Sequence, residues 1–91
     1  MIECEVTDED LALGDYLDVN NCPIVRAVAR KIPGSKVKIC VKAHLGPVVC
    51  WVNGREHAID PRGLEITRHL CENYCRGRTP PTDRAFGITP A

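Results

Sequence analysis

The stretch Asn20-Asn21-Cys22-Pro23 is the clearest helix start in this sequence, and it fixes where the first long helix begins. Asn20 or Asn21 can accept hydrogen bonds from the free N–H groups of the first turn. Pro23 suits that turn because its missing N–H would have no intrahelical partner there. Apolar residues then recur at intervals of three and four, which predicts a helix with one buried face: Ile24, Val25, Val28 and Ile32. We expect Pro33-Gly34 to end it.

Alternating apolar and polar residues predict strands on both sides of this helix. They cover residues 2–6, 36–42, 47–52 and 55–59, with one more short strand over 84–89. Asn53-Gly54 is a strong hairpin signal between two of these strands, because both residues tolerate positive φ. The order of elements predicts an α+β fold, in which a small, mainly antiparallel sheet of about four to five strands carries two helices on one face.

Two further sequence patterns mark helix ends. Thr7 and Asp10 form a capping-box pattern in front of a single helical turn, which Gly14 closes. Asp60-Pro61 opens the second long helix, and Gly77 ends it. With 91 residues the chain is long enough for one domain over residues 1–91. We expect residues 79–91 to be a partly extended C-terminal tail.

Charge is balanced over the whole chain, with twelve basic and twelve acidic side chains, but it is unevenly distributed. Residues 26–42 are rich in Lys and Arg. The acidic residues concentrate near the N-terminus: Glu3, Glu5, Asp8, Glu9, Asp10, Asp15 and Asp18. The two segments can pair within the fold, or the acidic one can contact a basic groove of a partner protein. The balanced total gives no sign of an electrostatic nucleic-acid binder.

The N-terminal residues Met1–Glu5 are acidic and lack an apolar core, so the sequence predicts neither a signal peptide nor a membrane span. We therefore expect a cytoplasmic protein whose six cysteines are thiols rather than a disulfide framework.

Two patterns among the cysteines bear on chemistry. Cys71 and Cys75 lie four residues apart beside His69, which is a weak zinc pattern because two further ligands are lacking. Cys22 lies at a helix N-terminus, a position that lowers a thiol pKa. As a nucleophile it would need a base, which could be His44, His57 or His69. Buried, unreactive thiols explain the same residues, and we expect no catalytic residue, metal or cofactor.

Two surface hypotheses remain. Trp51 lies in an apolar run, where it either fills the core or, if outside, anchors a partner protein. A basic face could contact phosphates, although no aromatic residues are interleaved with it: Lys36, Lys38, Lys42 and Arg55.

Three stretches resemble a group of small bacteriophage and prophage proteins, especially from phages of actinobacteria, that have no established activity. The stretches are Val6-Thr7-Asp8-Glu9-Asp10-Leu11-Ala12-Leu13-Gly14, Cys22-Pro23-Ile24-Val25-Arg26-Ala27-Val28 and Tyr74-Cys75-Arg76-Gly77-Arg78-Thr79-Pro80-Pro81. The chain departs from the group at Val25, where Ala is commoner, at Asn73-Tyr74, which replace Phe-Asp, and over 84–88. The resemblance implies a viral accessory protein of the host cytoplasm and transfers no functional residue.

We therefore expect a small non-enzymatic protein that binds and modulates a host protein, for example a defence-system inhibitor such as an anti-CRISPR. The first alternative is a nucleic-acid or nucleotide binding module that uses the face from Lys36 to Lys42. The second is a cysteine-dependent enzyme or a zinc protein. A homodimer formed through an edge strand is compatible with all three.

Overall fold

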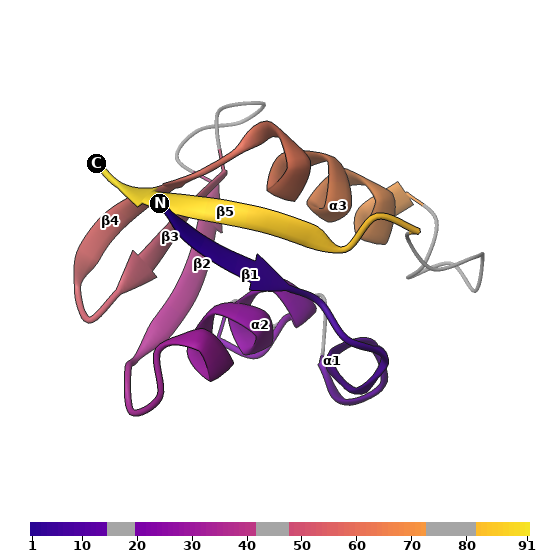
Figure 1. Cartoon of the computed structure of the whole chain (residues 1–91), viewed down its shortest axis with the longest axis horizontal. Helices are drawn as coiled ribbons and strands as arrows, with labels where there is room; N and C mark the ends of the chain where they lie inside the picture. Colours follow the sequence, from indigo (N-terminus) through magenta and orange to yellow (C-terminus); the bar gives the residue numbers. More distant parts are fainter. Residues whose placement is uncertain (15–19, 42–47, 73–81) are drawn as a thin grey trace.

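The computed structural model describes residues 1–14, 20–41, 48–72 and 82–91. Its elements, in chain order, are β1 (Ile2–Glu5), α1 (Asp8–Leu13), α2 (Pro23–Lys31), β2 (Val37–Val41), β3 (Val48–Val52), β4 (Arg55–Ile59), α3 (Pro61–Glu72) and β5 (Ala85–Pro90). The predicted α+β class is confirmed (Figure 1).

The five strands form one antiparallel sheet in the order β1-β5-β4-β3-β2. Strands β2, β3 and β4 follow each other as a meander, and Asn53-Gly54 joins the last two with φ angles of 51° and 83°, which confirms the predicted hairpin. Strand β5 lies between β1 and β4, where Phe86 pairs with Cys4 and Ile88 with Ile59. The predicted strand over 84–89 is confirmed as β5, but it lies inside the sheet instead of belonging to an extended C-terminal tail.

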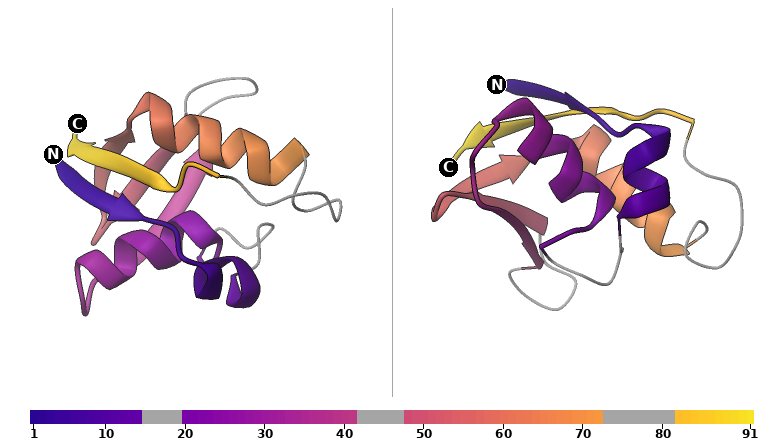
Figure 2. Two further views of the ribbon diagram at one scale, coloured as in Figure 1. Left: turned by 45° about the vertical axis from the view of Figure 1, so that its right-hand side comes forward. Right: turned by 90° about the horizontal axis from the view of Figure 1, so that it is seen from below.

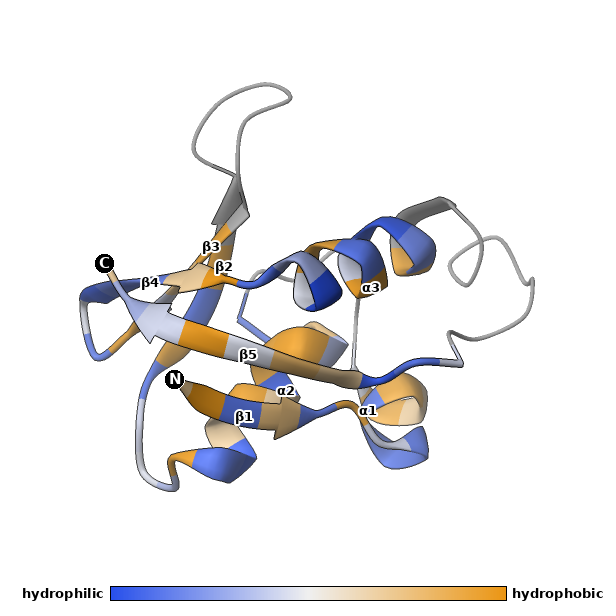
Figure 3. Cartoon of the chain, turned by 45° about the horizontal axis from the view of Figure 1, so that its top comes forward, coloured by the Kyte–Doolittle hydropathy of each residue, from blue (hydrophilic) through white to orange (hydrophobic). Residues whose placement is uncertain are grey.

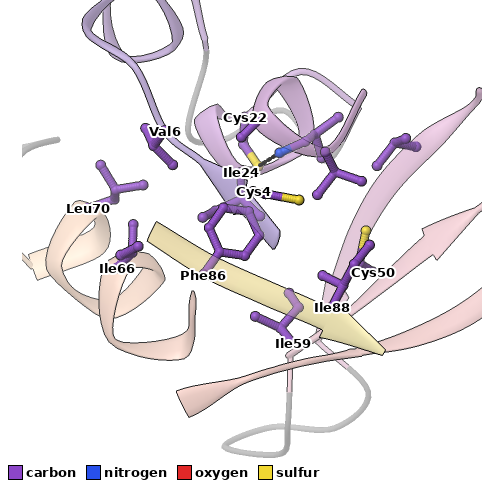
Figure 4. Close-up of a cluster of buried hydrophobic side chains, with 14 of the residues drawn as sticks. Cys4, Val6, Cys22, Ile24, Cys50, Ile59, Ile66, Leu70, Phe86 and Ile88 are labelled. Carbon is purple, nitrogen blue, oxygen red and sulfur yellow. Dashed lines mark hydrogen bonds between the residues drawn. The ribbon is translucent and has the colours of Figure 1, made fainter. Parts of the chain in front are cut away.

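One face of the sheet carries the core. We call the face that α2 and α3 cover the inner face. Residues paired directly across antiparallel strands point to the same face. The buried side chains form one cluster, shown in Figure 4, that includes Cys4, Val6, Ile24, Cys50, Ile59, Ile66, Leu70, Phe86 and Ile88. Hydrophobic and hydrophilic residues gather on different sides of α3 (Figure 3), and its Ile66 and Leu70 are buried in this cluster. The predicted packing of two helices on one face is confirmed.

The sheet is curled around α2. This helix contacts both β1 and β2, which are the two edge strands at opposite ends of the sheet order. Contact with both edges requires the sheet to bend, and both views in Figure 2 show this curvature. Helix α3 packs on β4 and β5 instead. The opposite, convex face of the sheet is called the outer face below.

The helix ends follow the sequence patterns with one correction. Thr7 caps α1, its hydroxyl accepting from the Asp10 N–H at 3.2 Å, and the Gly14 N–H donates to the Asp10 carbonyl at 2.9 Å, as predicted. Helix α2, however, is capped by Cys22 rather than by an asparagine. The Cys22 sulfur accepts from the Val25 N–H at 3.5 Å.

Asp60 caps α3 and also fastens that helix to the sheet. One carboxylate oxygen accepts from the Gly63 N–H and the other from the Gly87 N–H of β5, both at 2.9 Å. Gly63 allows the close approach, because a Cβ there would lie 2.3 Å from Ile59 Cγ2 and 3.2 Å from Phe86 Cβ. The predicted helix end at Gly77 lies outside the described residues.

Candidate functional site

Three cysteine thiols are buried in the core, and none of the three is in a disulfide. They lie on three elements, Cys4 on β1, Cys22 at the start of α2 and Cys50 on β3. Burial raises the pKa of Cys50 to about 12, and the nearby thiols of Cys22 and Cys4 add to the rise. Burial likewise raises the pKa of Cys4. A thiol held protonated in this way is a poor nucleophile at neutral pH, so the side chains of Cys4 and Cys50 act as apolar core residues.

Only some of the residues of the predicted cysteine and zinc chemistry lie in the described part of the chain. His57 pairs across the sheet with Cys50, and its ring is buried with Nδ1 3.0 Å from the Arg55 carbonyl oxygen. His69 is half-buried on α3. His44, Cys75 and the side chain of Cys71 lie outside the described residues. Within the part of the chain that is described, no three His, Cys, Asp or Glu side chains are placed to hold a metal ion.

Asp10 is a structural residue rather than a contact for a partner, which corrects the prediction for this position. Its side chain is fully buried, and Oδ2 accepts from the Thr7 N–H at 2.9 Å. Arg30 donates to both carboxylate oxygens, at 2.7 and 2.8 Å, and to the Glu5 carbonyl at 2.7 Å. Burial by itself raises the pKa of Asp10, but the hydrogen bonds from Arg30 and Thr7 outweigh it and lower that pKa.

The other acidic residues near the N-terminus that the structure describes lie at the surface, and several of them pair with arginines. Glu9 lies 3.8 Å from Arg26, so pairing between the acidic and basic segments is confirmed at Glu9 and Asp10.

Two more ion pairs use arginines beyond the basic segment. Arg62 binds Glu3 at 2.7 Å, and Arg84 binds Asp8. No local sequence pattern indicates these two pairs, because their partners are 59 and 76 residues apart. Glu5 is exposed, while Asp15 and Asp18 lie outside the described residues.

Trp51 lies on the outer face, away from both helices. It pairs directly with Lys38 on β2 and with Glu56 on β4, so the three side chains form a line across three strands. We call Lys38, Trp51 and Glu56 the Trp51 row. Lys38 is exposed, and Trp51 and Glu56 are half-buried. Trp51 is not among the half-buried hydrophobic residues that pack against the core in the described part of the chain, which are Ile2, Ala29, Ile32, Ile39 and Leu64. Of the two predicted places for Trp51, the structure supports the outside one.

Three of the four residues of the predicted basic face are exposed near the Asn53-Gly54 turn. Lys36 leads into β2, where its N–H donates to the Asn53 side chain at 2.9 Å. Lys38 follows two residues later on the outer face. Arg55 begins β4 but pairs with Val52, so it lies on the opposite face from Lys38, which corrects its place in the predicted basic face. Lys42 lies outside the described residues. Trp51 stands next to Lys38, so the structure supplies an aromatic neighbour that sequence spacing did not reveal.

A groove that the sequence did not predict runs beside α3. Its walls combine acidic and basic side chains from three elements, including Glu5, Arg62, Glu65, His69, Asp83 and Arg84. Arg62, Glu65 and Arg84 are already engaged in ion pairs. This pairing leaves the groove with little net charge to select a ligand.

No known protein family, curated protein or solved structure that was compared with this chain matches it. Among the described residues, no helix is both long enough and apolar enough to cross a membrane.

Proposed function

We propose that this chain is a non-enzymatic protein-binding module, encoded by a phage or prophage, that binds and modulates a host protein in the host cytoplasm. The observation that carries the proposal is the position of Trp51 on the outer face. Tryptophan is enriched among the residues that dominate binding energy, because it buries a large area at low entropic cost. The phage context rests on the resemblance of the α1 and α2 segments.

The titratable side chains of the fold support a binding role over a catalytic one. General acid–base chemistry requires groups that converge in a cleft with pKa values suited to proton transfer. Asp10 and Asp60 instead cap helices, and their pKa values are lowered by hydrogen bonds. Cys50 is buried with a raised pKa.

An inhibitor of a nucleic-acid-directed defence system, such as an anti-CRISPR, is a specific form of this proposal. The first turn of α1 supports it, because the side chains of Asp8 and Glu9 are 90% and 74% exposed. Exposed carboxylates at one end of a small domain complement the basic channels that hold nucleic acids.

The test is affinity capture from the lysate of an actinobacterial host with three baits: the wild type, Trp51→Ala and Lys31→Glu. Lys31 is exposed on α2, away from the outer face, and serves as the control. We expect the wild type and Lys31→Glu to retain one stoichiometric host protein that Trp51→Ala loses. Binding of that purified protein is then measured by calorimetry. Recovery of no stoichiometric partner, or equal recovery by all three baits, would contradict the proposal.

Nucleic-acid binding is a second candidate, favoured by the placement of Lys38 beside Trp51, with Lys36 two residues before Lys38. A base could stack on the indole while the cations contact phosphates. Trp51 is the only tryptophan in the chain, so its fluorescence reports binding directly. We would titrate single- and double-stranded oligonucleotides at low salt. Quenching that weakens as salt rises supports this candidate, and unchanged fluorescence at low salt removes it.

A further inference from the structure

The Trp51 row has a charge pattern that a second copy of the same chain complements. We propose that the protein forms a homodimer in which two outer faces stack on each other at Trp51. This proposal rests on the proposed function in one respect, because both place the contact on the outer face at Trp51. It adds that self-association covers this face, so that a host protein must compete with the second copy.

The argument begins with the order of charges along the row. Lys38 is on β2, Trp51 on β3 and Glu56 on β4, and direct pairing puts all three at one level of the sheet. Neighbouring strands lie about 4.8 Å apart. The backbone of Lys38 therefore lies about 5 Å to one side of Trp51 and that of Glu56 about 5 Å to the other, so side chains of opposite charge flank the indole.

Symmetry then selects one arrangement of two such faces. A two-fold axis parallel to β3, midway between the stacked sheets, reverses the row. Each Lys38 then faces the Glu56 of the other copy, and the two Trp51 rings meet at the axis. An axis running across the strands would instead place Lys38 on Lys38 and Glu56 on Glu56, which is unfavourable.

Face stacking is also better supported than pairing through the β2 edge. Strand β2 is an edge strand whose exposed Lys38 follows the exposed Lys36. Lysines on an edge strand oppose pairing with the same strand of another copy. In the stacked arrangement the charge of Lys38 is instead matched by the opposite charge of Glu56.

The experiment measures the mass of the purified protein by size-exclusion chromatography with light scattering over a range of concentrations. We expect the wild type to reach twice the chain mass of 10.1 kDa. Lys38→Glu and Glu56→Lys each create like-charge contacts in the dimer and should raise its dissociation constant at least about tenfold. Trp51→Ala should do the same. Circular dichroism checks that each variant is folded, and Lys31→Glu is the charge-reversal control that should remain dimeric.

Mixing the two charge variants provides the decisive measurement. Lys38→Glu carries two acidic groups in its row, and Glu56→Lys carries two basic groups, so each is matched only by the other. We expect a heterodimer in the mixture, resolved by native mass spectrometry. The double variant Lys38→Glu/Glu56→Lys should also dimerise with itself. An ion pair confined to one chain would be restored in the double variant but not by mixing, which separates the two explanations.

Three results would overturn the proposal: a wild type that stays monomeric at every concentration, a mixture that yields no heterodimer, or a Lys31→Glu control that dissociates like the row variants. No host protein enters the experiment. A monomeric wild type therefore refutes self-association and leaves the capture result for host binding unaffected.

Discussion

At the scale of single residues, Asp10 links several elements of the N-terminal third of the chain. Its carboxylate binds the Thr7 N–H and both terminal nitrogens of Arg30, and so it joins α1 to α2. Arg30 also holds the Glu5 carbonyl at the end of β1. One buried carboxylate thus fixes the relative positions of three elements.

We predict that Asp10→Asn destabilises the protein by about 2–3 kcal/mol, since an amide offers one acceptor oxygen where the carboxylate offers two charged ones. This loss of stability is smaller than the loss from breaking a fully buried ion pair, because the Arg30 side chain is 48% exposed. Urea unfolding gives the free energy of unfolding. The matched control is Asp8→Asn, whose exposed side chain should change it by less than about 0.5 kcal/mol. Equal effects would mean that the Asp10 network does not stabilise the fold.

The buried thiols give a second prediction at this scale. In the native protein at pH 8, Cys4, Cys22 and Cys50 should resist alkylation by iodoacetamide, because they are buried and the pKa values of Cys4 and Cys50 are raised. In urea all three should react. Peptide mass spectrometry after a brief exposure distinguishes the sites. Rapid native labelling of Cys22 would revive the hypothesis of a reactive thiol at the start of α2.

At the scale of elements, β5 is the strand that closes the sheet. It joins β1 to the meander, and its Phe86 and Ile88 side chains are fully buried. We predict that Phe86→Ala lowers the free energy of unfolding by about 3–5 kcal/mol, the usual cost of deleting a buried aromatic ring. Thr89→Ala, on the exposed side of the same strand, is the control. Thermal and urea unfolding would contradict the prediction if the two variants had similar effects.

The sequence predicted the local elements well because their signals are local. Caps, proline and glycine positions, and the period of apolar residues correctly indicated α1, most of α2 and the Asn53-Gly54 hairpin. The cap of α2 was misassigned because sulfur is a weak acceptor, and asparagine is the commoner capping residue. The central place of β5 was missed because strand order depends on which distant strands pair, and Phe86 and Ile88 do not encode that choice by themselves.

The candidate site was less predictable for the same physical reason. Trp51 was identified as a core or interface residue, but its face depends on the pairing of three strands. The ion pairs of Arg62 and Arg84 likewise link residues that only the fold brings together. Asp10 was placed at a partner surface because a run of acidic residues usually lies in solvent, whereas the arginine that buries it is twenty residues away.

At the scale of the whole molecule, helices α2 and α3 pack on different parts of one curled sheet, and each is held there by a carboxylate. Helix α2 spans the two edge strands, and Asp10 with Arg30 holds it to the N-terminal segment. Helix α3 covers β4 and β5, and Asp60 holds it to Gly87. The interactions of Asp10 and Asp60 both require an ionised carboxylate, so the stability of the entire fold should depend on pH in the acid range.

The sign of that dependence follows from the direction of the two pKa shifts. Burial by itself raises the pKa of each carboxyl, but hydrogen bonds from Arg30 and Thr7 lower that of Asp10, and those from Gly63, Arg62 and Gly87 lower that of Asp60. The unfolded chain therefore takes up protons at a higher pH than the native protein does. The stabilisation is complete above the ordinary carboxyl pKa of about 4 and is lost as pH falls below it through the native values.

We predict that the free energy of unfolding, measured in urea from pH 6 to pH 2, decreases as the pH falls through this window. Asp10→Asn and Asp60→Asn should each be less stable than the wild type at pH 6 and show a shallower decrease, and the double variant should show the shallowest. The difference in free energy of unfolding between wild type and variant must shrink as pH falls, because protonation of the wild-type carboxylate removes the same interactions that the substitution has already removed. If the free energy of unfolding of the double variant fell with pH as steeply as that of the wild type, then other carboxyl groups, and not Asp10 and Asp60, would control acid unfolding.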